Sequence, residues 1–195
     1  ANNTAVGYAA LTANTTGTLN TAVGTSALES NTTTHNNTAM GYRALRVSTG
    51  SANTSVGTGS LESNTTASNN TAVGTSALTA NTTGNNNTAV GFEALDVATT
   101  GYNNVGLGAL SAGATTSGHS NVSIGRNSGY TTTTGYRNIS IGTSTRPTSA
   151  GDNNVIAIGY NISGGAGYTT LGNGTADIRA AHGVATWATV SDQRY

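Results

Sequence analysis

The chain has 195 residues, of which only 7% are charged, and its seven basic residues balance seven acidic ones. A nucleic-acid-binding domain normally carries an excess of Lys and Arg, so this composition argues against such a partner. Cysteine is absent, which excludes a disulfide framework and a thiolate metal site. Because no apolar stretch approaches the roughly 20 residues of a membrane-spanning helix, we expect no membrane insertion.

A short pattern, first present as Asn3-Thr4-Ala5-Val6-Gly7, returns along the chain at an almost constant spacing. Its closing glycines are 17 residues apart, with a single interval of 16: Gly7, Gly24, Gly41, Gly57, Gly74, Gly91, Gly108, Gly125, Gly142 and Gly159. This period is too short for a helical hairpin repeat, and the leucine-rich signature is missing. The pattern predicts an all-β fold, a β-solenoid with one repeat in each turn.

In the first six turns the pattern continues into an Ala-Leu pair and a polar link, and we predict two short strands and a loop in each turn. Side chains alternate along a strand, which puts Thr4 and Val6 on one face. We therefore expect the valine and leucine positions to form the core. These two columns are Val6, Val23, Met40, Val56, Val73 and Val90, and Leu11, Leu28, Leu45, Leu61, Leu78 and Leu95.

The asparagine that opens each repeat forms a third column: Asn3, Asn20, Asn37, Asn53, Asn70, Asn87, Asn104, Asn121 and Asn138. Stacked asparagines can hydrogen-bond through their side-chain amides from turn to turn, so we favour this structural role over a binding role. Further asparagines begin N-x-T sequences typical of glycosylation sites, matches that are expected by chance in such a composition: Asn14, Asn31, Asn64 and Asn81.

Three segments differ in their pattern. Residues 1–95 hold the regular NTAVGxxAL repeats. In residues 96–160 the Ala-Leu half loses its register at Ala109-Leu110, and the repeat becomes N-V-x-I-G, which implies a tighter or more shared core. Beyond Tyr160 the period fails, and Gly164-Gly165-Ala166-Gly167 predicts a flexible break before a C-terminal neck in residues 161–195.

The two positions after each repeat glycine vary more than the rest of the unit. Variation on a constant scaffold is typical of a recognition surface, although drift at exposed positions or contacts between chains would produce it as well. The candidates for receptor binding are Tyr8, Tyr42, Arg43, Phe92 and Glu93.

Catalytic chemistry has little support in this composition. His35, His119 and His182 are far apart along a solenoid, and acidic residues are few and scattered. A glycan-degrading enzyme would need paired carboxylates in a groove. We therefore expect no enzymatic activity, no metal site and no cofactor.

The unit N-T-A-V-G-Y-x-A-L resembles the head repeats of trimeric autotransporter adhesins and related repeats of bacteriophage tail fibres, over roughly residues 1–160. The resemblance implies a left-handed parallel β-roll in which three chains pack into a homotrimeric rod. It also implies a structural and adhesive function, in which the fibre presents a surface to a host-cell receptor such as a glycan. The alternatives are the head of a bacterial adhesin and the non-catalytic part of a tailspike enzyme.

A second resemblance lies near residue 195. The stretch from Leu171-Gly172-Asn173-Gly174 through Trp187 to Ser191-Asp192-Gln193-Arg194-Tyr195 is similar to the junction before the intramolecular chaperone domain of tail fibres and endosialidases. In that family the serine and a following lysine cleave the chain once, which implies such a role for Ser191 and Asp192 in a longer precursor. This junction favours a virion location over a bacterial cell surface, and we expect the chain to be a fragment or a processed product.

Overall fold

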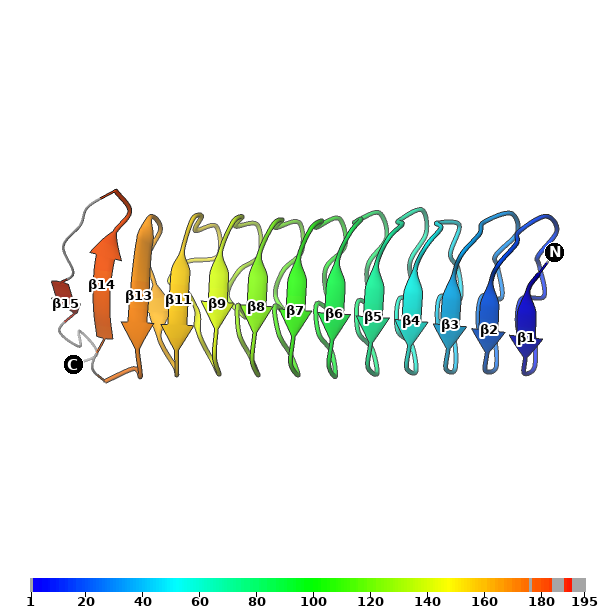
Figure 1. Cartoon of the computed structure of the whole chain (residues 1–195), viewed down its shortest axis with the longest axis horizontal. Helices are drawn as coiled ribbons and strands as arrows, with labels where there is room; N and C mark the ends of the chain where they lie inside the picture. Colours follow the sequence, from blue (N-terminus) through cyan, green and yellow to red (C-terminus); the bar gives the residue numbers. More distant parts are fainter. Residues whose placement is uncertain (1, 176, 184–187, 191–195) are drawn as a thin grey trace.

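The computed structural model describes residues 2–175, 177–183 and 188–190, and its regular elements in these ranges are all strands. The chain winds as a β-solenoid, and each turn adds one short strand to a long parallel sheet (Figure 1). This arrangement confirms the predicted fold class. The strands of the periodic part are β1 (Thr4–Val6), β2 (Thr21–Val23), β3 (Thr38–Met40), β4 (Thr54–Val56), β5 (Thr71–Val73), β6 (Thr88–Val90), β7 (Val105–Leu107), β8 (Val122–Ile124), β9 (Ile139–Ile141) and β11 (Ile156–Gly159).

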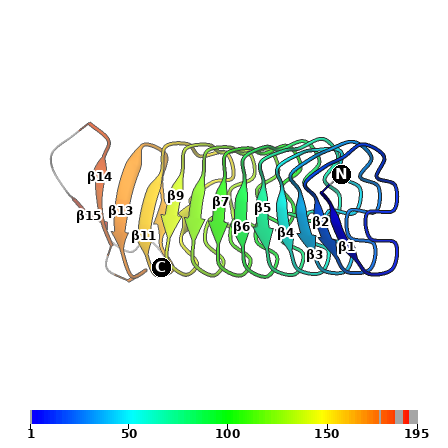
Figure 2. The ribbon, with the colours of Figure 1, turned by 45° about the vertical axis from the view of Figure 1, so that its right-hand side comes forward.

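Neighbouring strands pair in the register of the repeat. Thr4 lies beside Thr21 at one end of the sheet, and Ile139 lies beside Ile156 further along. The connecting segments return behind the sheet, as the rotated view in Figure 2 shows. Each repeat position therefore forms a column of side chains that runs the length of the solenoid.

The sheet continues beyond the segment in which the period fails. β13 (Tyr168–Gly172) pairs in parallel with β11, and Ile156 lies beside Thr169, so this turn has 13 residues. The predicted break at 164–167 lies within this turn and does not interrupt the sheet. Two antiparallel strands, β14 (Asp177–Ala181) and β15 (Ala188–Val190), then complete it.

Each regular turn contains one strand, and the prediction of two was wrong. The segment after the repeat glycine consists of tight turns, because left-handed residues such as Ser26 (φ 58°) and Leu28 (φ 51°) interrupt it. A residue with this φ cannot continue a β-strand. In the described part of the chain, a second sheet forms only where β10 (Arg146–Pro147) pairs with β12 (Ser163–Gly164).

Three columns adopt this left-handed conformation in the regular turns. They begin at Asn2, Ala9 and Leu11, and no Thr, Val or Ile occupies them, although Thr is abundant elsewhere in the chain. β-branched side chains are the most strained at positive φ. The absence of β-branched residues from three positions of the repeat can be seen in the sequence, and it indicates that the backbone is left-handed there.

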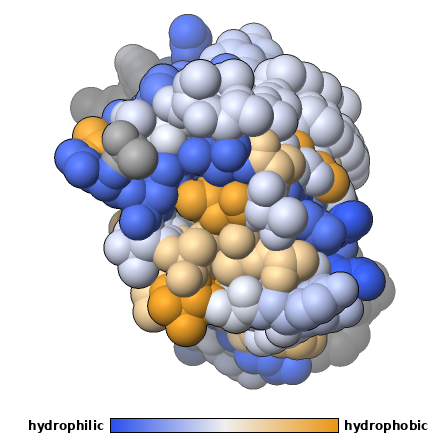
Figure 3. Space-filling model, turned by 90° about the vertical axis from the view of Figure 1, so that its right-hand side faces the viewer, coloured by the Kyte–Doolittle hydropathy of each residue, from blue (hydrophilic) through white to orange (hydrophobic). Residues whose placement is uncertain are grey.

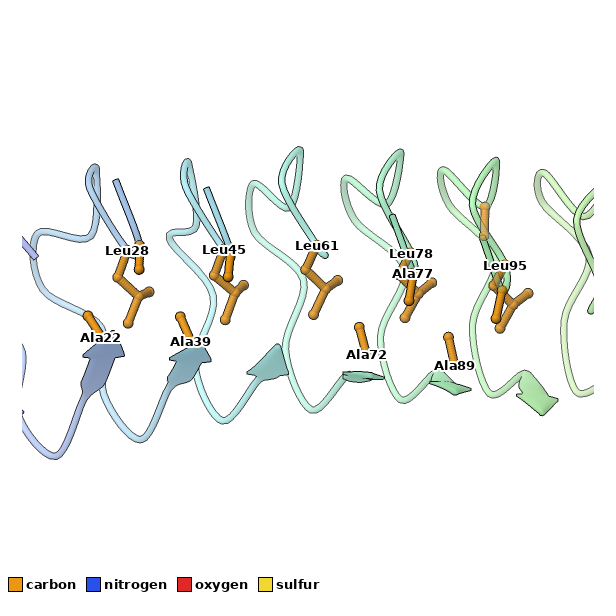
Figure 4. Close-up of a cluster of buried hydrophobic side chains, with 14 of the residues drawn as sticks. Ala22, Leu28, Ala39, Leu45, Leu61, Ala72, Ala77, Leu78, Ala89 and Leu95 are labelled. Atoms are coloured by element: carbon orange, nitrogen blue, oxygen red, sulfur yellow. The ribbon is translucent and has the colours of Figure 1, made fainter. Parts of the chain in front are cut away.

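The core was predicted correctly for the leucine column and wrongly for the valine column. Leu28, Leu45 and Leu61 are fully buried, whereas Val6 and Met40 are 58% and 45% exposed. The strands bury their central residue instead, which is alanine in most turns (Figure 4). The coil is narrow, so the sheet presents a small side chain to the leucine opposite, and alternation then turns the outer two residues of each strand away from the core.

The register of the Ala-Leu half does not slip at Ala109-Leu110, contrary to the prediction. The backbone N–H of Leu110 donates to the carbonyl of Phe92, so Leu110 continues the column of Glu93. Ala112 continues the leucine column, since the N–H of Leu95 donates to the carbonyl of Ser111. Only the side chains change here, and the backbone keeps its path.

The asparagine column is bonded chiefly to the backbone. Asn70 Oδ1 accepts from the backbone N–H of Asn87 at 2.8 Å, and Asn70 Nδ2 donates to the carbonyl of Gly84 at 2.9 Å. In the separate column of N-x-T asparagines, direct bonds between amides occur, as from Asn81 Nδ2 to Asn64 Oδ1 at 2.9 Å. These two N-x-T asparagines are fully buried, so neither offers a side chain for glycosylation.

A turn is covered only by the turns on both of its sides. Figure 3 views the solenoid from the β1 end, where apolar side chains are visible across the cross-section. All three residues of β1 are exposed, whereas Ala22, at the centre of β2, is buried. The stability of this fold therefore comes from stacking between neighbours, as in other repeat proteins.

The repeat glycines provide a test of this stacking. At Gly57 the φ is +134°, and a Cβ would lie 2.5 Å from the carbonyl oxygen of Gly74 in the next turn. We expect Gly57→Ala to lower the free energy of unfolding by about 3 kcal/mol or more, because it adds both backbone strain and a clash with main-chain atoms.

The matched control is Gly59→Ala, two residues away. Gly59 has a φ of +66°, and the nearest atom to an added Cβ is 3.5 Å away. This variant should cost only about 1–2 kcal/mol, because it adds left-handed strain without a clash. Chemical denaturation followed by circular dichroism measures both, and equal effects would show that the glycine contact does not limit stacking.

Candidate functional site

The receptor-binding candidates lie on one edge of the solenoid, directly after the C-terminal ends of the strands. Tyr8, Tyr42 and Phe92 are 82%, 47% and 51% exposed, Arg43 is also exposed and Glu93 is half-buried. The sequence places their aromatic rings in one column. That column also contains Tyr160, which is 61% exposed and was missed because its turn lies beyond the regular repeats. The name aromatic edge refers below to Tyr8, Tyr42, Phe92 and Tyr160.

The backbone holds this edge rigidly. The N–H of Gly59 donates to the carbonyl of Tyr42, and the N–H of Leu110 donates to the carbonyl of Phe92, both at 2.9 Å. Tyr8 and Tyr42 are two turns apart, about 10 Å at the usual strand spacing, and Phe92 is three turns further, about 14 Å. A ligand that contacts two of these rings must therefore extend along the solenoid axis.

Opposite charges offset each other near the middle of the aromatic edge. Glu62 Oε1 lies 3.1 Å from Arg46 Nε and 3.6 Å from Arg43 Nη1. The guanidinium of Arg43 also lies over the ring of Tyr42, 4.9 Å from its centroid. Around Tyr42 the positive charge is thus partly offset, and the exposed rings of this edge suit the apolar face of a neutral sugar or an apolar peptide side chain.

An acidic pair lies beside Phe92. Burial of the carboxyl raises the pKa of Asp96, and the negative charge of Glu93 raises it further, while hydrogen bonds from the backbone act in the opposite direction. The ionised form of Asp96 is therefore less stable in the folded protein than in the unfolded chain.

A second surface is the outer face of the parallel sheet. In β1 to β6 this face carries Thr and Val or Met, but in β7, β8, β9 and β11 both outer positions are aliphatic. The name apolar face refers below to these outer residues of β7, β8, β9 and β11: Val105, Leu107, Val122, Ile124, Ile139, Ile141, Ile156 and Ile158. They are half-buried or exposed, with Ile158 at 37%.

Over the same turns the interior of the coil becomes less apolar. The column that holds leucine through Leu95 continues as Ala112 and Gly129, and the inward residue of the strand becomes Ser123 and then Ser140. Both serines are buried. From β7 to β9 the coil therefore has small or hydroxyl side chains inside and aliphatic side chains outside.

Other predicted residues are not brought together. His35 Nδ1 accepts from the backbone N–H of Thr18 at 3.0 Å, far along the axis from His119 and His182. Within the described ranges, no group of three His, Cys, Asp or Glu residues could hold a metal ion. The same ranges contain no helix that could cross a membrane. Ser191 and Asp192 lie outside the residues that the structure describes.

No protein-family model matches this sequence, and no curated protein or solved structure is significantly similar to it. The site is therefore described by its own geometry, as a rigid rod with an aromatic edge and a long apolar face.

The raised pKa of Asp96 predicts how stability depends on pH. Between the pKa of the unfolded chain and the higher pKa of the folded protein, the folded state binds more protons, so this group's contribution favours folding as the pH falls through that window. We expect Asp96→Asn to raise the melting temperature slightly at pH 7, by less than about 4 °C, and to lose this advantage below about pH 4.

The companion variant is Glu93→Gln, which removes the nearby charge but leaves Asp96 in its half-buried place. This variant should raise the melting temperature at pH 7 by less than Asp96→Asn does, and the increase should show the same pH dependence. Thermal melts from pH 3.5 to pH 8 measure the effect, and a lower melting temperature for Asp96→Asn at pH 7 would contradict the prediction.

Proposed function

We propose that this chain is the shaft of a homotrimeric adhesive fibre, a phage tail fibre or related virion appendage that holds a receptor-binding surface toward the host cell. The repeat resembles those of such fibres, and the solenoid is a rigid rod of the kind this function needs. The aromatic edge is the proposed receptor-binding surface, and a host-cell glycan is the proposed receptor.

The observation that carries the trimer is the reversal of polarity at β7. A soluble single chain stabilises itself by placing aliphatic side chains inside, as the first six turns do with leucine. In the later turns the aliphatic side chains lie on a flat outer face, where they gain stability only when another surface covers them. The proposed partner is the same face of two further copies, which would give each thin coil a shared core.

The head of a bacterial adhesin is the second candidate, because it would use the same rod and the same assembly. The similarity of residues 171–195 to a chaperone junction favours the virion fibre. On this proposal an intramolecular chaperone assists assembly, and Ser191 takes part in its release. A non-catalytic segment of a tailspike remains the third candidate.

The trimer is tested by charging the apolar face. The double variant Ile139→Lys with Ile141→Lys places two cations on adjacent outward positions of β9, both of them half-buried. We expect the parent to sediment as three chains and this variant to sediment as single chains or to unfold, since buried unpaired charges are strongly destabilising.

The control, Thr100→Lys with Thr134→Lys, adds the same charge at exposed positions away from the sheet. It should remain trimeric. Analytical ultracentrifugation reports the mass and circular dichroism reports folding. A folded, monomeric parent protein would refute the trimer.

The receptor-binding surface is tested on the aromatic edge itself. The triple variant Tyr8→Ala, Tyr42→Ala and Phe92→Ala removes exposed rings, and we expect it to lose at least tenfold in binding to those bacterial strains of a panel that bind the parent fibre. Flow cytometry with labelled fibre measures the binding.

The matched control uses polar residues of the same column in other turns. Thr25→Ala, Thr58→Ala and Thr75→Ala alter equivalent backbone positions without removing a ring. This variant should bind as the parent does. Equal binding by both triple variants would place the receptor site elsewhere on the fibre.

A further inference from the structure

Three rings stack on the opposite edge of the solenoid, just before the N-terminal ends of the strands. The imidazole of His119 lies between the rings of Tyr102 and Tyr136, with centroids 4.6 Å and 5.1 Å away and interplanar angles of 6° and 3°. The three residues are one repeat apart, and each lies in the segment that leads into a strand: Tyr102 before β7, His119 before β8 and Tyr136 before β9. We refer to them as the ring stack.

The backbone fixes the ring stack on both sides. The N–H of Ser120 donates to the carbonyl of Tyr102 at 3.0 Å, and the N–H of Arg137 donates to the carbonyl of His119 at 3.2 Å. The rings therefore need little ordering when a ligand binds, which lowers the entropic cost of recognition.

In other turns, the side chain at the position of Tyr102 and Tyr136 accepts a hydrogen bond from the backbone of the preceding turn. Asn85 Oδ1 accepts from the backbone N–H of Ser68 at 2.7 Å, and Asn153 Oδ1 accepts from that of Tyr136 at 2.8 Å. Tyr102 and Tyr136 make no such bond to the preceding turn within the described residues. Two hydrogen bonds between turns are therefore missing at the positions where tyrosine replaces asparagine in this column.

The rings of the stack cover each other's facing sides, so a ligand reaches all three of them at their edges. His119 Nδ1 lies 3.3 Å from Ser120 Oγ, which leaves Nε2 for another partner. The hydroxyls of Tyr102 and Tyr136 are not among the buried polar atoms of the described chain and have no hydrogen-bond partner there. The edge offers a row of three groups that can form hydrogen bonds, spaced along the axis at about the strand separation.

Arg137 lies beside the ring stack. The guanidinium of Arg137 lies 5.7 Å from the centroid of the Tyr136 ring, and in the described part of the chain no carboxylate pairs with it. Asp152, in the next turn, accepts instead from the backbone N–H of Ser149 at 2.8 Å. Arg43 on the aromatic edge differs, because Glu62 offsets its charge.

We propose that Tyr102, His119, Tyr136 and Arg137 form a binding site for an acidic sugar, with Arg137 on the carboxylate and the ring edges on the neighbouring hydroxyls. A single cation suits a single carboxylate, and charge-assisted bonds from Arg are the strong ones. A phosphate polymer would need a row of cations, which this edge lacks. The inference concerns a different edge from the proposed receptor surface and does not depend on it.

The experiment measures binding of small acidic sugars to the intact protein in its native assembly. The probes are sialyllactose and trigalacturonate, and the neutral controls are lactose and the methyl ester of trigalacturonate. We expect saturation-transfer NMR and calorimetry to show at least a tenfold preference for one or both acidic probes, weakened by added salt.

Two kinds of variant localise the site. Arg137→Gln should weaken acidic binding about tenfold or more, and Tyr102→Phe with Tyr136→Phe should weaken it while the rings still stack and the melting temperature stays unchanged. The matched control is Arg126→Gln, an exposed arginine of the same turn on the aromatic edge, which should leave binding unchanged.

Three results would overturn the proposal. They are no binding of either acidic probe, equal binding of acidic and neutral probes, or an equal loss in Arg126→Gln and Arg137→Gln. Loss of cell binding through the aromatic edge is a separate measurement, so failure of one proposal does not imply failure of the other.

Discussion

The close stacking of one turn on the next is the constraint on which the rest of this structure depends. At the repeat glycines the main chain of one turn lies so near the main chain of the next that no Cβ fits between them. Each residue is therefore held beside its own equivalent in the neighbouring turn. Any property of one position, whether polar, aliphatic or aromatic, is repeated along the axis as a column, and the solenoid acquires its edges and faces in this way.

This constraint explains how so thin a coil buries polar groups. The asparagines that open the repeats bind backbone N–H and carbonyl groups at almost the same place in successive turns, so a repeated pattern satisfies the buried amides of this column. Leucine and alanine fill the remaining space in the first six turns. Beyond them the interior loses its leucines while the outer face of the sheet gains aliphatic residues, and the backbone path stays the same.

The two edges that flank the sheet differ in their electrostatics. On the aromatic edge the exposed rings are separate from one another, and Glu62 lies close to Arg43 and Arg46. On the other edge the rings cover one another, and Arg137 has an aromatic neighbour only. One rod can therefore present two different aromatic surfaces at fixed separation, because both belong to the same rigid stack of turns.

The sequence by itself determined the period, the all-β solenoid, the leucine column and the asparagine column, because these depend only on spacing and residue type. It could not decide which face of each strand points inward, since alternation in Thr-Ala-Val permits either Ala or the Thr and Val pair to be buried. The width of the coil decided this, because only a small residue such as alanine fits opposite leucine. Tertiary structure also decided that left-handed turns replace the second strand, that the register holds through Leu110, and that His119 lies between two tyrosines.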